Sequence, residues 1–191
     1  MEPRWYAGIG SRETPEDMLT LMSDVAEQLA MAGWGLRSGG ARGADSAFEE
    51  GAIRVDGARE IFVPEAGYGG RSDAIDASAL PQATEAEHMA SQLHPAWDRL
   101  APMVRRLMTR NVHQVLGPNL DDPVRFVLCW AKGSRLRAGH VVDVVGGTGL
   151  AVRLAAVRNI EVFNLHEPEH LARIERWMAT LRREDPSMPT P

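Results

Sequence analysis

The chain has 191 residues, 44% of them hydrophobic, which suits one domain with a core and excludes a chain that is disordered throughout. Its formal net charge of −5 argues against a surface coated with positive charge for duplex DNA, although it permits a local basic groove. The single cysteine, Cys129, excludes an internal disulfide and a cysteine-based zinc cluster.

The first part of the chain alternates predicted strands and helices. Residues 4–9 predict a strand that ends in the glycines Gly8 and Gly10. Thr14 as N-cap and Pro15 as first helical residue predict the start of a helix that runs to Gly33. The elements predicted next are a strand at 34–37, a helix at 44–55 and a strand at 60–63.

The second part continues this alternation after an irregular stretch at residues 65–83. The predicted elements are helices at 84–93 and 97–116, a strand at 124–130, an exposed basic loop at 132–140, a strand at 141–145, a helix ending near 158, a strand at 160–165 and a C-terminal helix around 171–181. The strand at 124–130 is apolar throughout, as expected where helices cover both faces of a sheet.

This alternation predicts an α/β fold: Rossmann-like, with a mostly parallel sheet and helices on both faces. We expect one domain over residues 1–184 and a frayed, proline-rich tail at 185–191. No apolar run approaches the roughly 20 residues that span a bilayer, and no signal peptide is evident. We therefore expect a cytoplasmic protein with no membrane partner.

Three glycine-rich turns each follow a predicted strand. The most informative reads Ser-Gly-Gly-Ala-Arg-Gly-Ala-Asp over residues 38–45 and precedes a helix. Such a turn gathers backbone N–H groups at a helix N-terminus, where they bind anions, most often phosphate. Because the carboxyl ends of parallel strands meet at one edge, we expect the three turns to form one phosphate site. The candidate residues are Gly10, Ser11, Arg12, Ser38, Gly39, Gly40, Arg42, Gly43, Gly146, Gly147, Thr148 and Gly149.

Two carboxylates follow the main turn on one face of the next helix. Asp45 is a candidate to bind a ribose hydroxyl, to order Arg42, or to act as an acid–base group, and Glu49 is a weaker candidate for catalysis. The alternative for both is plain stabilisation of a helix N-terminus by negative charge.

Residues 166–170 read His-Glu-Pro-Glu-His and match the H-E-x-x-H zinc pattern letter for letter. That pattern requires both histidines on one helical turn. Pro168 suits only the first helical position, which puts His166 outside the helix. We therefore expect a loop and a helix start here, and no metal site.

The segment 38–45 resembles the Ser-Gly-x-Ala-Arg-Gly-x-Asp signature of the DNA-processing protein A (DprA/Smf) family. That family lies in a Rossmann-like superfamily that also holds the LOG phosphoribohydrolases. Gly8 to Arg12 is similar to its first glycine turn, and residues 146–163 are similar to its late glycine turn, helix and strand. Arg110-Asn111 is similar to the start of its Arg-Asn-Arg segment, with Val112 in third place.

The resemblance implies that Arg110, Asn111 and Arg153 join the site. It also implies a ligand that is a nucleotide or single-stranded nucleic acid. LOG enzymes cleave the N-glycosidic bond of nucleoside monophosphates with a glutamate, and Arg153 falls at that glutamate's position.

The leading hypothesis is a DprA-like protein that binds a nucleotide or single-stranded DNA. The alternatives are a LOG-like phosphoribohydrolase and a non-catalytic module that senses or sequesters a nucleotide signal. We expect no resident cofactor, and a homodimer.

Overall fold

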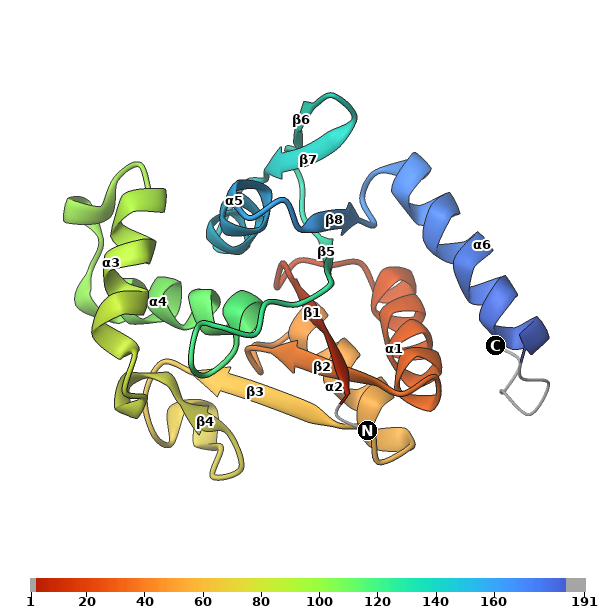
Figure 1. Ribbon diagram of the computed structural model, residues 1–191, viewed down its shortest axis with the longest axis horizontal. Coiled ribbons are helices and arrows are strands. Elements are labelled where there is room, and N and C mark those ends of the chain that lie inside the picture. Colours follow the sequence, from red (N-terminus) through yellow and green to blue (C-terminus); the bar gives the residue numbers. More distant parts are fainter. Residues whose placement is uncertain (1–2, 185–191) are drawn as a thin grey trace.

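A six-stranded parallel sheet forms the centre of the structure, a computed structural model that describes residues 3–184 (Figure 1). Its strands lie in the order β4 (Ile75–Asp76), β3 (Arg59–Val63), β2 (Trp34–Ser38), β1 (Arg4–Gly10), β5 (Phe126–Trp130) and β8 (Glu161–Asn164). Every neighbouring pair is parallel, so the predicted Rossmann-like α/β class is confirmed. The predicted tail at 185–191 lies outside the described residues.

Helices cover both faces of this sheet and produce two separate cores. One face carries α1 (Glu16–Met31), α2 (Ala44–Arg54) and α6 (Pro168–Glu184), whereas the other carries α3 (Ala83–Leu93), α4 (Pro102–Leu116) and α5 (Gly149–Val157). Successive strand residues point to opposite faces, so Tyr6 of β1 packs in the first core and Ala7 in the second. All five residues of β5 are buried, which is what its unbroken apolar run predicts.

Close backbone packing fixes the position of α2 against its neighbours. A Cβ atom at Gly51 would overlap the carbonyl oxygen of Ser23 in α1. At Gly43, which has a φ of 91°, a Cβ atom would lie 2.7 Å from the carbonyl oxygen of Ser11. The glycines therefore bring the N-terminus of α2 directly against the turn that follows β1.

Two predicted helix boundaries are wrong. Pro15 occupies the N-cap position of α1, and the hydroxyl of Thr14 donates to the carbonyl oxygen of Ser11 at 2.8 Å instead of capping the helix. The helix expected at 97–116 is divided into a 3-10 turn (Trp97–Arg99) and α4. Ala101 is extended between them because Pro102 disfavours the helical conformation in the residue before it.

The strand expected at 141–145 is present, although it lies outside the main sheet. The loop expected at 132–140 is wrong, because part of it forms a second strand that pairs with the first in a hairpin. Strands β6 (Arg135–Arg137) and β7 (His140–Asp143) pair antiparallel. Ala138 and Gly139 connect them with φ angles of 50° and 81°, and a tight hairpin turn requires positive φ at both positions. Alanine rarely adopts this conformation, so the sequence concealed the turn.

The irregular stretch expected at residues 65–83 holds only short elements, namely two 3-10 turns (Tyr68–Gly70 and Ala77–Ala79) and the two-residue edge strand β4. As predicted, α6 begins at Pro168 and leaves His166 outside the helix. Among the described residues, no helix combines the length and apolar character that a membrane crossing requires.

We predict that Gly51→Ala lowers the free energy of unfolding by about 1–3 kcal/mol, because the added methyl group forces α1 and α2 apart. Alanine is otherwise the better helix former, so a loss isolates the steric effect. Urea unfolding provides the measurement. The control is Glu50→Ala at the exposed neighbouring position, where we expect a change within about 0.5 kcal/mol.

Candidate functional site

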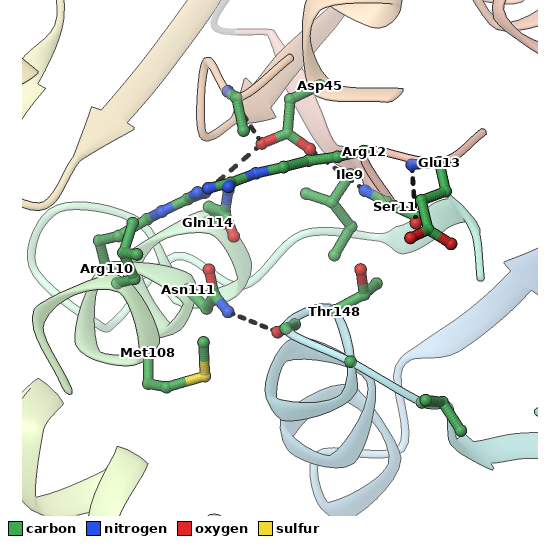
Figure 2. Close-up of a pocket in the computed structure, with 16 residues that line it drawn as sticks. Ile9, Ser11, Arg12, Glu13, Asp45, Met108, Arg110, Asn111, Gln114 and Thr148 are labelled. Carbon is green, nitrogen blue, oxygen red and sulfur yellow. Dashed lines mark hydrogen bonds and ion pairs between the residues drawn. The ribbon is translucent and has the colours of Figure 1, made fainter. Parts of the chain in front are cut away.

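The candidate site lies where the order of the strands reverses. The chain passes from β1 to β2 and β3 on one side, and later returns to β5 and β8 on the other side. Ligands of open α/β sheets bind in the crevice outside the carboxyl ends of strands at such a point. A pocket of about 310 Å³ lies there (Figure 2), lined by Ile9, Gly10, Ser11, Arg12, Glu13, Ala41, Asp45, Leu107, Met108, Arg110, Asn111, Gln114, Val145, Gly146, Gly147 and Thr148.

A buried ion pair crosses this pocket from α2 to α4. Oδ2 of Asp45 lies 3.6 Å from Nη1 of Arg110, and the two side chains are 5% and 8% exposed. Oδ1 of Asp45 accepts from the amide of Gly10 at 3.1 Å, and Oδ2 accepts from the amide of Ala41 at 3.4 Å. Asp45 thus joins the end of β1, the main glycine turn and α4.

Burial disfavours both charges of this pair. It raises the pKa of the Asp45 carboxyl, whereas Arg110 and the two amides act to lower that pKa. Burial likewise lowers the pKa of Arg110, and Arg12 adds to this effect, whereas Asp45 opposes it. For Arg110, burial therefore outweighs the attraction of its carboxylate partner.

A second polar chain connects the main glycine turn to the third turn through α4. With its amide oriented to suit its neighbours, Gln114 accepts from the amide of Gly39 at 2.9 Å and from Arg110, and donates to Oδ1 of Asn111 at 3.0 Å. Asn111 in turn donates to the carbonyl oxygen of Gly147 at 2.9 Å. Asn111 therefore positions the third turn.

The N-terminus of α5 presents unused donors to the pocket. Within the described residues, the amides of Gly146, Gly147 and Thr148 make no hydrogen bond. The first N–H groups of a helix have no partner inside the helix and carry partial positive charge. Nε of Arg110 is also buried and has no hydrogen-bond partner among the described residues. Buried donors without a partner are rare in folded proteins, so these two sets of donors make the pocket a candidate anion site.

Arg12 adds a second positive charge at the mouth of the pocket. In Figure 2 its side chain and that of Arg110 extend toward each other close to Asp45. Arg12 is exposed and forms no ion pair with any described residue. Two guanidinium groups that face each other repel, and an anion bound beside them relieves that repulsion.

The structure brings together the predicted residues Gly10, Ser11, Arg12, Asp45, Arg110, Asn111, Gly146, Gly147 and Thr148. Four others support the pocket from behind. The hydroxyl of Ser38 donates to the carbonyl oxygen of Gly8 at 2.6 Å, a Cβ atom at Gly39 would overlap Arg110, Gly40 packs on Arg71, and Gly149 begins α5.

Three predicted residues do not reach the pocket. Arg42 is exposed and lines a separate hollow between α1 and α2. Glu49 is buried against the guanidinium group of Arg71, at 2.8 Å from its Nη1. Arg153 extends away to Asp143 at 2.6 Å and to the carbonyl oxygen of Leu93 at 3.0 Å. For Glu49 and Arg153, a partner that the sequence did not place nearby holds the side chain away from the pocket.

Sequence reasoning missed Gln114, although a signal was present. Arg110, Asn111 and Gln114 are spaced so that they share one side of a helix, and every residue from Met108 to Leu116 is buried. Polar residues that share a buried helix face must bond to something, which points to a site.

Comparisons with known proteins agree with this architecture. A family model described as DNA recombination-mediator protein A matches residues 1–90. DNA processing protein A from Helicobacter pylori, whose structure is described for its single-stranded DNA binding mode, superposes with a TM-score of 0.56 at 18% identity, over 96% of this chain and 82% of that one. Residues 1–90 are therefore similar to this family, and the chain shares the fold of the Helicobacter pylori protein.

Two further solved structures are similar to this chain. DprA from Streptococcus pneumoniae gives a TM-score of 0.48 at 15% identity, over 96% of this chain and 56% of that one. The molybdenum cofactor carrier protein of Chlamydomonas reinhardtii gives a TM-score of 0.49 at 18% identity, over 95% of this chain and 87% of that one. A comparison with curated protein sequences finds no significant match.

We predict that Arg110→Met lowers the free energy of unfolding by about 3–5 kcal/mol, because it leaves the Asp45 carboxylate buried without its partner. The double variant Arg110→Met/Asp45→Asn, which removes both charges, loses less than the single variant. Urea unfolding of the pair measures this coupling. Arg106→Met, one turn earlier in α4 at an exposed ion pair with Glu65, is the control and changes stability by less than about 1 kcal/mol.

Proposed function

We propose that this DprA-like protein binds the phosphate group of a nucleotide unit in the pocket at the carboxyl ends of β1 and β5. The observation that carries the proposal is the set of unfilled donors on facing walls, namely Nε of Arg110 and the amides at the N-terminus of α5. Phosphate suits such donors because its oxygens accept several hydrogen bonds at once and its charge complements the helix dipole.

The shape and lining of the pocket suit the rest of a nucleotide. A volume of about 310 Å³ lies at the lower end of the range for small-molecule sites. Ile9, Leu107, Met108 and Val145 give the pocket apolar surface beside the polar donors. A nucleotide unit with its phosphate on Arg110 and α5 would place its sugar and base against this surface.

The phosphate can come from a free nucleotide or from single-stranded nucleic acid. Likeness to a protein described for single-stranded DNA binding supports the second source. The net charge of −5 supports a small nucleotide. Either source fits a protein that acts by binding, whether it holds a strand or senses a nucleotide signal.

A LOG-like hydrolase is the second candidate function, and the observation that favours it concerns Asp45. Its raised pKa would suit a proton donor. Both carboxyl oxygens, however, already accept hydrogen bonds from backbone amides, and Arg153 lies outside the pocket. The arrangement therefore favours binding without turnover. We still expect a cytoplasmic homodimer. Light scattering, which measures the molar mass in solution, tests the oligomeric state.

We predict that Arg12→Ala weakens nucleotide binding by about 1.5–3 kcal/mol, the range for hydrogen bonds to charged groups. Its exposed position leaves the fold intact. Isothermal titration with a panel of nucleoside monophosphates measures the effect. Arg42→Ala is the matched control, because Arg42 lies in the same region but outside the pocket. Equal losses for both variants would contradict the assignment of Arg12.

We also predict that incubation with nucleoside monophosphates releases no free base, measured by chromatography for base and ribose phosphate. An arginine at the position of the LOG glutamate cannot transfer protons at neutral pH. Turnover that Asp45→Asn abolishes would make the hydrolase the better assignment.

A further inference from the structure

The β6–β7 hairpin concentrates positive charge in an otherwise acidic chain. Residues 132–140 include Lys132, Arg135, Arg137 and His140 and no acidic residue. Lys132 and Arg137 form no ion pair with any described residue. Arg135 lies 3.5 Å from Asp143 with its side chain 70% exposed, so its guanidinium group stays available to a ligand.

The hairpin arginines line a hollow that is larger than the pocket at the carboxyl ends of the strands. It measures about 940 Å³ and lies between the hairpin, α5 and the start of β8. Arg135, Arg137 and Arg153 line it, and Glu161 is the single carboxylate in the lining. Arg153 is already engaged with Asp143 and Leu93. The cations available to a ligand are therefore Arg137, which forms no described ion pair, and the largely exposed Arg135.

The residues at the base of the hairpin also form part of the rim of the nucleotide pocket. Val145 lines that pocket, and its amide donates to the carbonyl oxygen of Lys132 at 3.0 Å. Its side chain packs against Gly133, where a Cβ atom would lie 2.5 Å from Cγ2 of Val145. Figure 1 shows the hairpin projecting beyond the sheet, next to α5 and β8. A strand that leaves the pocket past Val145 and follows the hairpin toward the start of β8 would reach Arg135 and Arg137.

We propose that the β6–β7 hairpin is a second phosphate-binding contact, in which Arg135 and Arg137 hold a single-stranded nucleic acid beyond the unit seated in the pocket. The proposal rests on the proposed function of the pocket, and it selects a strand over a free nucleotide as the ligand. Planar guanidinium groups match phosphate oxygens in pairs. An acidic protein segment is the alternative partner, because the exposed Leu136 would offer it an apolar contact beside the two arginines. The continuity of the hairpin with the pocket favours a nucleic acid.

The test compares Arg135→Gln/Arg137→Gln with the wild-type full chain. The probes are thymidine monophosphate and fluorescein-labelled oligothymidylates of graded length, titrated at several salt concentrations. We expect the double variant to bind the longest oligomer roughly tenfold more weakly. The slope of log K against log salt should fall by about 1.4, at about 0.7 for each lost phosphate contact on a single strand. Monophosphate binding should be unchanged.

The control variant Arg54→Gln/Arg59→Gln removes the same charge from exposed arginines of α2 and β3. It separates a local contact from the effect of net charge, and it should leave the salt slope unchanged. Thermal melting of both variants checks that the fold is intact.

The outcomes distinguish this proposal from the proposed function. Unchanged length dependence and salt slope in the hairpin variant, with the pocket still binding, overturn the hairpin contact and leave an acidic protein segment as the alternative partner. Loss of oligomer binding in the hairpin variant, while Arg110→Met binds normally, supports the hairpin and overturns the pocket. If the wild type binds no probe, both proposals fail.

Discussion

The buried pair between Asp45 and Arg110 is the constraint on which the site depends. It takes two charges out of water, so it persists only where other groups complete their hydrogen bonds. The amides of Gly10 and Ala41 do so for Asp45, and Gln114 does so for part of Arg110. The glycines at positions 39 and 43 allow these elements to approach closely enough. The first two glycine turns thus meet in satisfying one carboxylate and one guanidinium group, and the third turn is joined to them through Asn111 and Gln114.

Much of this fold was visible in the sequence because the signals were local. The unbroken apolar run of β5 predicted a strand covered on both faces, and the residues 38–45 predicted a turn between β2 and α2. Elements decided by unusual backbone conformations were not visible. The hairpin turn depends on Ala138 at positive φ. The break before α4 depends on the extended conformation of Ala101, which precedes Pro102.

The site was predicted less completely, for a physical reason. The residue types and the glycine turns predicted which groups could bind an anion. The direction in which each side chain points depends instead on partners that are distant in sequence. Arg153 is directed to Leu93, which lies 60 residues away in sequence. Gln114 was missed for a related reason. Its spacing from Arg110 and Asn111 along the helix was visible in the sequence, but the burial of that side of the helix was not.

The pocket is divided between the two halves of the chain. The family match ends at residue 90, so it covers β1, the main glycine turn and Asp45, whereas Arg110, Asn111, Gln114 and the N-terminus of α5 come from beyond it. A protein built this way can keep its anchoring half constant while the other half changes. The recognisable N-terminal motif thus supplies one wall of the pocket, and α4 together with the turn before α5 supplies the other.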